Sequence, residues 1–302
     1  MPPWPVCPRG RSNASATSGP RSTCARPWSR SEGAMTTERY VLLSHRHPGR
    51  AGSPDVPVRL VAYGFAGGTV TALLPLLRHL PPGIEVWGAE YPGRGLRWRE
   101  PLLDRAADVI DDLLPGLQRL ADRPLALLGY SMGAHFAYRL SLAAAFAPLG
   151  LVAISARAPG GVVVAPSWSE LDDSDLLRRL RALGGMPDEV LENPVMRDAF
   201  LPVVRADLAC CRSLERLPVR PAPCPVLALR GDADPLLTPS DPAQWLALAP
   251  RRANATRRYP AGHFIHPGRE AQVASDIATW LARATSPATD HNPALLAAST
   301  RR

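Results

Sequence analysis

Residues 124–146 read PLALLGYSMGAHFAYRLSLAAAF, and this stretch decides the fold. The apolar run Leu125–Leu128 predicts a fully buried strand, and the Ala- and Leu-rich run Ala134–Phe146 predicts a helix. Between them, residues 129–133 have the pattern GxSxG. A strand that turns directly into a helix strains the central serine, and flanking glycines let the two backbones pass closely. We therefore expect Ser131 at the carboxyl edge of a sheet, with its hydroxyl exposed.

The pattern GxSxG is short and recurs by chance, so its context decides whether Ser131 is a nucleophile. The predicted strand before it and helix after it are the context that the motif requires. At the helix N-terminus, the N–H of Met132 points toward any negative oxygen that develops there.

The remaining chain alternates short apolar strands with amphipathic helices. Strands are predicted at residues 58–63, 84–89, 150–155 and 225–229, and at a short segment that reaches Tyr259; helices are predicted at 69–80, 104–120 with Asp104 as the cap, 241–249 and 267–284. This alternation is typical of an α/β fold with a doubly wound, mostly parallel sheet.

The alternation stops at about residues 157–216, where no strand is predicted. Helical segments at 172–183, 188–191 and 194–214 indicate an insertion over the carboxyl end of the sheet, which we expect to be a helical lid above Ser131. Seven apolar side chains there line either a channel or an ordinary packed core: Leu176, Leu180, Leu183, Met186, Phe200, Val204 and Leu208.

Serine catalysis needs a base and a carboxylate that orients it, and in such sheets these follow in the order Ser, acid, His. Asp234 follows the 225–229 strand directly before Pro235, and we favour it over Asp232, which could equally cap the turn. His263 follows the last strand, and we favour it over His266, which precedes Pro267 at a helix start.

An oxyanion hole needs a second N–H, and the loop after the 58–63 strand is the place for it. Phe65-Ala66-Gly67-Gly68 puts the Ala66 N–H in position to converge with the Met132 N–H. The alternative is a glycine turn without a catalytic role. No spacing of Cys, His or carboxylate residues suggests a metal site.

Composition excludes several other classes. The 302 residues are 46% hydrophobic with a formal net charge of +8, and all of the positive charges are arginine. Five arginines and one glutamate lie in residues 1–34, so the charge is concentrated at that end and is poor evidence for nucleic-acid binding. Five cysteines without metal spacing suit reduced thiols in the cytoplasm, and no apolar run is long enough to cross a membrane.

The ends of the chain have a different composition from its body. Residues 1–34 are rich in Pro, Ser, Arg and Gly and lack an apolar period, so we expect a disordered extension. The single catalytic domain is predicted at 35–284, and residues 285–302 are expected to form a C-terminal tail.

Seven motifs in this order resemble the type II thioesterases of polyketide and non-ribosomal peptide synthases, which are α/β-hydrolases. They are Ala66-Gly67-Gly68; Tyr91-Pro92-Gly93-Arg94 with Arg97 and Glu100-Pro101; the Gly-x-Ser-Met-Gly-Ala bend; Leu183-Gly184-Gly185 with Pro187; Pro202-Val203-Val204-Arg205-Ala206-Asp207; Gly231-Asp232-x-Asp234-Pro235; and Gly262-His263-Phe264. The likeness covers about residues 58–284.

The resemblance implies hydrolysis of acyl or aminoacyl thioesters from the phosphopantetheine arm of acyl or peptidyl carrier protein domains, with no cofactor of its own. It implies Ser131 as nucleophile, His263 as base, Asp234 as its orienting acid, and Ala66 and Met132 as oxyanion donors. Tyr130 departs from the family pattern, because many relatives have His there. A hydrolase of small esters and an inactive carrier-binding module remain the alternatives.

A carrier domain is usually acidic, and exposed arginines are the side chains that would receive it. The candidates from the sequence are Arg94, Arg97, Arg178, Arg179 and Arg205.

Overall fold

The computed structural model describes residues 36–37, 39–44, 58–161, 168, 170–186, 188–249 and 253–285. The chain divides into two units, residues 1–34 and residues 35–302. The predicted N-terminal extension lies outside the described residues, as does the predicted tail beyond residue 285.

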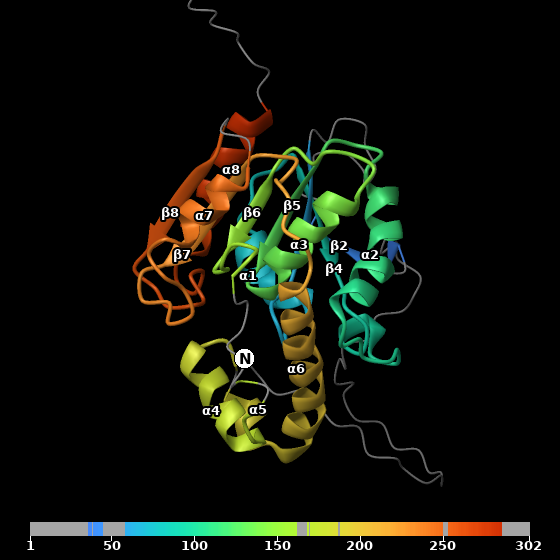
Figure 1. The fold of residues 1–302 in the computed structure, drawn as a ribbon, viewed down its shortest axis with the longest axis vertical. Coiled ribbons are helices and arrows are strands. Elements are labelled where there is room, and N and C mark those ends of the chain that lie inside the picture. The colour runs from blue at the N-terminus through green and yellow to red at the C-terminus, as the bar shows by residue number, and fades with distance from the viewer. Residues whose placement is uncertain are drawn as a thin grey trace, which may run out of the picture. The chain divides into compact units, whose positions relative to one another are not determined.

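An eight-stranded sheet forms the centre of the second unit (Figure 1). Its strands are β1 (Thr36–Thr37), β2 (Tyr40–Ser44), β3 (Val58–Tyr63), β4 (Ile84–Ala89), β5 (Leu125–Tyr130), β6 (Leu151–Ile154), β7 (Val226–Gly231) and β8 (Ala255–Tyr259). The order is β1-β2-β4-β3-β5-β6-β7-β8. The pairs β1–β2 and β2–β4 are antiparallel, and all pairs from β4 to β8 are parallel. The mostly parallel, doubly wound sheet predicted from the sequence is therefore confirmed.

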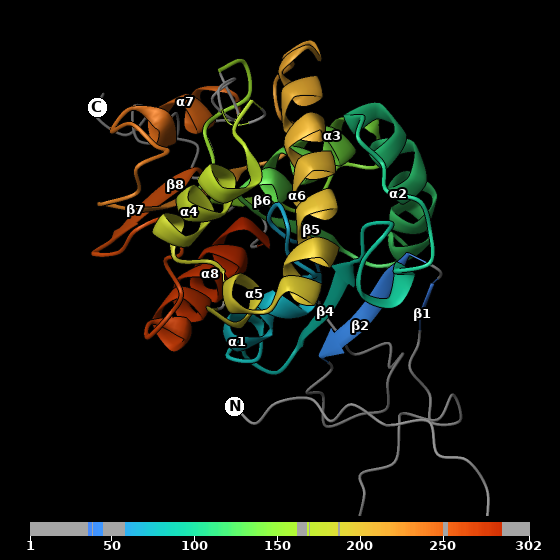
Figure 2. The same cartoon turned by 90° about the horizontal axis from the view of Figure 1, so that it is seen from below.

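Helices cover both faces of this sheet (Figures 1 and 2). They are η1 (Val70–Leu73), α1 (Leu74–Leu77), η2 (Gly95–Arg97), α2 (Ala106–Leu120), α3 (Met132–Ala143), α4 (Asp173–Leu183), α5 (Asp188–Glu192), α6 (Pro194–Glu215), α7 (Asp241–Ala247) and α8 (Glu270–Thr285). No described helix is long and apolar enough to cross a membrane.

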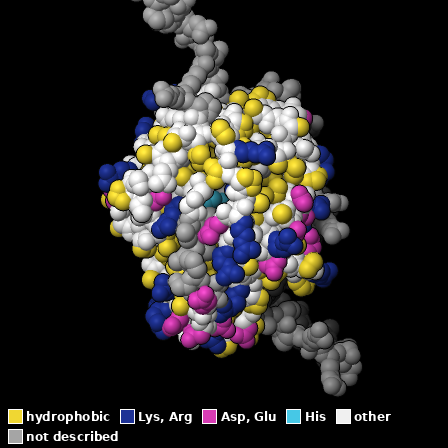
Figure 3. Space-filling view, in the orientation of Figure 1, with side chains coloured by type: hydrophobic (Ala, Val, Ile, Leu, Met, Phe, Trp, Pro, Cys, Tyr) yellow, Lys and Arg dark blue, Asp and Glu magenta, His cyan; other side chains and the backbone are white. Residues whose placement is uncertain are grey.

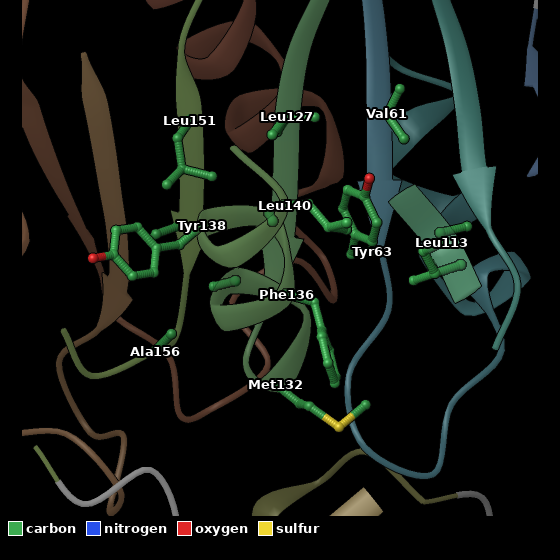
Figure 4. Packing of buried hydrophobic residues seen from close by; sticks show 14 of the residues in the cluster. Val61, Tyr63, Leu113, Leu127, Met132, Phe136, Tyr138, Leu140, Leu151 and Ala156 are labelled. Atoms are coloured by element: carbon green, nitrogen blue, oxygen red, sulfur yellow. The ribbon is translucent and has the colours of Figure 1, made fainter. Parts of the chain in front are cut away.

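The strand period of two divides the buried side chains into two layers. In β3, Val61 and Tyr63 face the layer with α2, α3 and Trp245 of α7, whereas Leu60 and Ala62 face the layer with α1 and α8. Figure 4 shows how side chains from β3, β5, β6, α2 and α3 fill the first layer. Because β5 is buried on both faces, it occupies the middle of the molecule, as its apolar run predicts.

The lid consists of α4, α5 and α6, which lie together beyond one edge of the sheet (Figure 1). It has its own apolar cluster, which contains three of the seven side chains proposed for a channel, and the other four are partly buried and pack against it. The cluster contacts the sheet domain at the carboxyl edge of the sheet, next to Gly67, which follows β3. A Cβ on Gly67 would lie only 2.7 Å from Val204 Cγ2 and 2.9 Å from Phe200 Cε2. These side chains are therefore packed together, and the channel stays a prediction.

Several predicted boundaries need correction. The continuous helix expected over 69–80 is a 3₁₀ turn followed by the short α1, which has Pro75 in its first turn. Helix α2 begins one residue after Arg105, so Asp104 is not its cap; Ser213 Oγ of α6 instead accepts the Ala106 N–H at 2.7 Å. Helix α3 is shifted toward its N-terminus, and α8 begins at Glu270 rather than residue 267.

Candidate active site

Ser131 occupies the bend between β5 and α3 in a strained backbone conformation, with φ +53° and ψ −116°. Such a conformation costs about 1–3 kcal/mol and persists only where the surroundings fix it. Here the Ser131 N–H donates to the Ile154 carbonyl oxygen at 2.8 Å, which continues the pairing of β5 with β6. The bend places Ser131 at the carboxyl edge of the central strand.

The two flanking glycines are required by close backbone contacts. A Cβ on Gly129 would lie 2.2 Å from the Gly133 carbonyl oxygen, and a Cβ on Gly133 would lie 2.2 Å from the Tyr63 carbonyl oxygen. Real Cβ atoms do not approach so closely, so α3 can begin against the end of β3 only with glycine at both positions.

His263 and Asp234 form a buried pair in the loops after β8 and β7. Nδ1 of His263 lies 2.9 Å from Oδ2 of Asp234, and both residues are less than 5% exposed. The second carboxylate oxygen, Oδ1, accepts the Leu236 N–H at 2.9 Å, which holds the carboxylate in place. With Nδ1 engaged, Nε2 is the ring nitrogen left for proton transfer.

The competing residues have other environments. Asp232 is partly exposed and pairs with Arg258 at 2.7 Å. His266 is buried, its Nδ1 has no hydrogen-bond partner among the described residues, and burial lowers its pKa. Asp234 and His263, which the sequence favours over Asp232 and His266, are thus the residues that contact each other.

The Ala66 turn, Ser131 and His263 are brought together by three aromatic neighbours. Phe65 precedes Ala66, Tyr130 precedes Ser131, and Phe264 follows His263. The ring centroid of Phe65 lies 5.8 Å from the ring centroid of Tyr130 and 4.8 Å from that of Phe264. The ring centroids of Tyr130 and Phe264 are 5.6 Å apart. The three segments that carry the predicted site residues therefore meet at one place.

Tyr130 also joins the nucleophile strand to the histidine loop by hydrogen bonds. Its hydroxyl donates to the His263 carbonyl oxygen at 3.0 Å and accepts the Ile265 N–H at 2.7 Å. In the sequence, Tyr130 is recognisable only as a departure from the family pattern, and this contact was not predicted. No local sequence pattern indicated this contact, because Ile265 lies 135 positions further along the chain.

Asp207 of α6 is a second residue that the sequence analysis did not place at the site. It is 3% exposed, and its Oδ2 accepts the Gly67 N–H at 2.7 Å. Arg94 binds both of its oxygens, at 2.5 and 2.7 Å. Both residues occur in the quoted family motifs, but no local pattern indicated that they pair across 113 positions.

The proposed arginine surface for a carrier domain is wrong for two of its five members. Arg94 is buried against Asp207, and Arg97 is buried against Glu100 and Asp112. The other three lie on the lid, where Arg178 pairs with Asp175, Arg205 pairs with Asp173, and the Arg179 guanidinium lies 5.8 Å from the Trp168 ring centroid. Figure 3 shows positive and negative side chains interleaved over this part of the surface.

Among the described residues, no group of three or more His, Cys, Asp or Glu side chains is arranged to hold a metal ion. Cys210, Cys211 and Cys224 are free, buried thiols, and burial raises the pKa of each above its ordinary value. These thiols are poor candidates for nucleophiles, because the thiolate is the reactive form.

Comparison with known proteins gives the family. The family model of the thioesterase domain matches residues 58–281. AMB antimetabolite synthetase AmbE of Pseudomonas aeruginosa is 34% identical over 190 residues, which span 62% of this chain and only 9% of AmbE.

Two solved structures match most of the chain. RedJ, a thioesterase from the prodiginine biosynthetic pathway of Streptomyces coelicolor, is 31% identical with a TM-score of 0.68, over 74% of this chain and 90% of RedJ. The type II thioesterase BorB from the borrelidin biosynthetic cluster is 27% identical with a TM-score of 0.67, over 80% of this chain and 97% of BorB. This chain therefore belongs to the thioesterase domain family, with the α/β-hydrolase fold.

Proposed function

We propose that this protein hydrolyses acyl or aminoacyl thioesters on the phosphopantetheine arm of acyl or peptidyl carrier protein domains, as an editing enzyme of a polyketide or non-ribosomal peptide synthase. The observation that carries the proposal is the buried His263–Asp234 pair, joined through Tyr130 to the strained bend at Ser131. The pathways of RedJ and BorB support the substrate class.

In the first half-reaction, Ser131 Oγ attacks the thioester carbonyl carbon while His263 Nε2 takes the hydroxyl proton. Asp234 holds the ring through Nδ1 and stabilises the imidazolium that forms. The N–H groups of Ala66 and Met132 bind the oxygen that becomes negative. When the C–S bond breaks, His263 returns the proton to the departing pantetheine thiol.

In the second half-reaction, water replaces the thiol. His263 Nε2 takes a proton from the water, which attacks the acyl-Ser131 ester through the same oxyanion-stabilised intermediate. The C–O bond to Ser131 breaks, the serine regains its proton, and the free acid leaves. The only prosthetic group in this scheme is the arm of the partner, and the reaction is placed in the cytoplasm, with no nucleic acid or membrane partner.

The test is hydrolysis of an acylated carrier protein by the purified enzyme, with release of free acid measured by mass spectrometry. We expect turnover by the wild-type protein and its loss in Ser131→Ala and His263→Ala. We expect Asp234→Asn to lower kcat by about 10³- to 10⁴-fold, because a neutral amide neither fixes the required histidine tautomer nor stabilises the imidazolium. The control variant Asp232→Asn should retain activity, because Asp232 pairs with Arg258 instead.

The alternatives predict different results in the same assay. Turnover of small soluble esters with carrier-bound thioesters untouched would identify an esterase. Binding of the carrier protein without hydrolysis of any acyl donor would identify a binding module.

A further inference from the structure

The lid contacts the Ala66 turn through the carboxylate of Asp207. Asp207 lies in α6, which belongs to the lid, yet its Oδ2 accepts the N–H of Gly67, the residue after Ala66. This contact joins segments 140 residues apart in the sequence. The apolar side chains of α6 reach the same residue, because Val204 and Phe200 occupy the space where a Gly67 Cβ would lie.

The turn has the geometry of type II. The Gly68 N–H donates to the Phe65 carbonyl oxygen at 3.1 Å, so Ala66 and Gly67 are its central residues. Gly67 has φ +77°, whereas Ala66 is not among the residues with positive φ. In this turn type the peptide between the central residues is flipped relative to type I. If the peptide between Ala66 and Gly67 flipped back, the Ala66 carbonyl oxygen would point toward the Asp207 carboxylate. Asp207 therefore favours the observed orientation of this peptide.

Arg94 neutralises the carboxylate where it would otherwise oppose catalysis. An unpaired negative charge beside the oxyanion hole would raise the energy of a negative transition state. Arg94 makes two hydrogen bonds to Asp207, and its guanidinium lies 5.3 Å from the Tyr91 ring centroid. The Tyr91 hydroxyl in turn donates to the Gly64 carbonyl oxygen at 3.2 Å, so the turn segment is held on both sides.

We propose that Asp207 is a positioning residue through which the lid helix α6 holds the Ala66 N–H in place for the oxyanion. The inference rests on the proposed function, which gives Ala66 its role as a donor. It adds that a donor of the catalytic body is held by a side chain of the lid, so the oxyanion hole is complete only with α6 in its observed place.

Two near-isosteric variants test this proposal. Asp207→Leu removes every acceptor for the Gly67 N–H, whereas Asp207→Asn keeps one oxygen. We expect Asp207→Leu to lower kcat for a soluble acyl thioester by about 100-fold, the scale of losing one oxyanion donor. KM should stay within about threefold, because the ground-state thioester does not need the donor. Asp207→Asn should retain distinctly more of the wild-type kcat than Asp207→Leu.

A binding measurement separates positioning from a general loss of structure. The affinity for a trifluoromethyl ketone, which forms a tetrahedral oxyanion on the serine, should fall in parallel with kcat/KM, whereas the affinity for an unreactive thioether analogue should not. The matched control is Asp173→Asn, which breaks the ion pair between Arg205 of α6 and Asp173 of α4 and leaves the turn untouched. It should keep the wild-type kcat.

The proposal is overturned if folded Asp207→Leu keeps kcat within about threefold of wild type, or if its kcat and thioether affinity fall together. Should Asp207→Leu not fold, hydrogen exchange of the Gly67 amide in Asp207→Asn decides, because exchange faster than in wild type together with wild-type kcat would contradict the role, whereas faster exchange with a lowered kcat would support it. Failure of the proposed function itself is distinguishable, because it would appear in the wild-type protein as no hydrolysis of an acylated carrier protein, whereas failure of the present proposal appears only in the Asp207 variants.

Discussion

At the scale of single residues, two tyrosine hydroxyls make hydrogen bonds of the same kind at different places in the fold. Each donates to one backbone carbonyl oxygen and accepts one backbone N–H. Tyr130 bridges the His263 carbonyl oxygen and the Ile265 N–H. Tyr138, two turns along α3, donates to the Arg220 carbonyl oxygen at 2.5 Å and accepts the Arg220 N–H at 3.0 Å. Both rings are fully buried, so the pair separates a catalytic contribution from a contribution to stability.

We predict that Tyr130→Phe lowers the free energy of unfolding by about 1–3 kcal/mol, because it leaves two buried backbone groups unpaired, and that Tyr138→Phe lowers it by about 1 kcal/mol, because its partner Arg220 is exposed to water. Only Tyr130→Phe should also lower kcat, by about tenfold, because the His263 loop loses its anchor to the nucleophile strand. Denaturant unfolding and steady-state kinetics measure the two effects. Equal kcat in the two variants would show that the Tyr130 hydroxyl does not position His263.

Glu90 gives the stability a dependence on pH with a defined sign. Burial raises the pKa of Glu90 from 4.5 to about 7, although the nearby Arg94 opposes the shift. Its Oε1 has no hydrogen-bond partner in the part of the chain that the structure describes. Between pH 4.5 and 7 the folded protein holds a proton that the unfolded chain has released, so the free energy of unfolding falls as pH rises through this window.

Glu90→Gln removes this titration and keeps the shape of the side chain. We expect the free energy of unfolding of the variant, relative to wild type, to rise by up to about 3 kcal/mol from pH 4.5 to 7.5. The exposed Glu189→Gln serves as the control and should run parallel to wild type. Parallel pH curves for Glu90→Gln and wild type would contradict the prediction.

The difference between what could and could not be predicted is already visible among residues. Ser131, Asp234 and His263 each lie in a short local pattern at a strand end, and the order of such ends in a parallel sheet is known in advance. Asp207 acts through partners 113 and 140 positions away, and Tyr130 acts through a partner 133 positions away. Their positions in the sequence are compatible with ordinary packing, so only the assembled fold shows what they contact.

At the scale of elements, the junction of β5, α3 and β3 depends on the absence of a side chain at Gly133. We predict that Gly133→Ala lowers the free energy of unfolding by about 3 kcal/mol or more, because the new Cβ would overlap the Tyr63 and Gly64 carbonyl oxygens and displace backbone. Labelling of Ser131 by a fluorophosphonate should fall with it. Gly161→Ala is the control, because its Cβ would meet only an ordinary contact at 3.7 Å.

A Gly133→Ala variant as stable as wild type would show that α3 can move away from β3 without cost.

The same junction explains why the central elements were predictable. Buried parallel strands have continuous apolar sequences and are followed by helices, so β3 through β7 are visible in the sequence. The antiparallel β2 was missed, because its place in the sheet depends on pairing with β4, which no local pattern indicates.

At the scale of the whole molecule, a buried ion pair joins the lid to the sheet domain, whereas exposed ion pairs join the lid helices to each other. Arg94 and Asp207 are each less than 10% exposed, and they connect the loop after β4 to α6. Arg205 and Asp173 connect α6 to α4 at the surface, with side chains 36% and 59% exposed. Exposed pairs contribute little, whereas removing one partner of a buried pair leaves an unpaired charge.

We therefore predict that Arg94→Met lowers the free energy of unfolding by about 3–5 kcal/mol, whereas Arg205→Met lowers it by no more than about 1 kcal/mol. Hydrogen exchange should accelerate in α6 and in the turn at Gly67 of Arg94→Met, because the unpaired Asp207 carboxylate is driven toward water. Adding Asp207→Leu to Arg94→Met should recover part of the stability, since no buried charge then remains. Equal stability losses in Arg94→Met and Arg205→Met would mean that apolar packing of Val204 and Phe200 on Gly67, rather than the ion pair, holds the lid to the sheet domain.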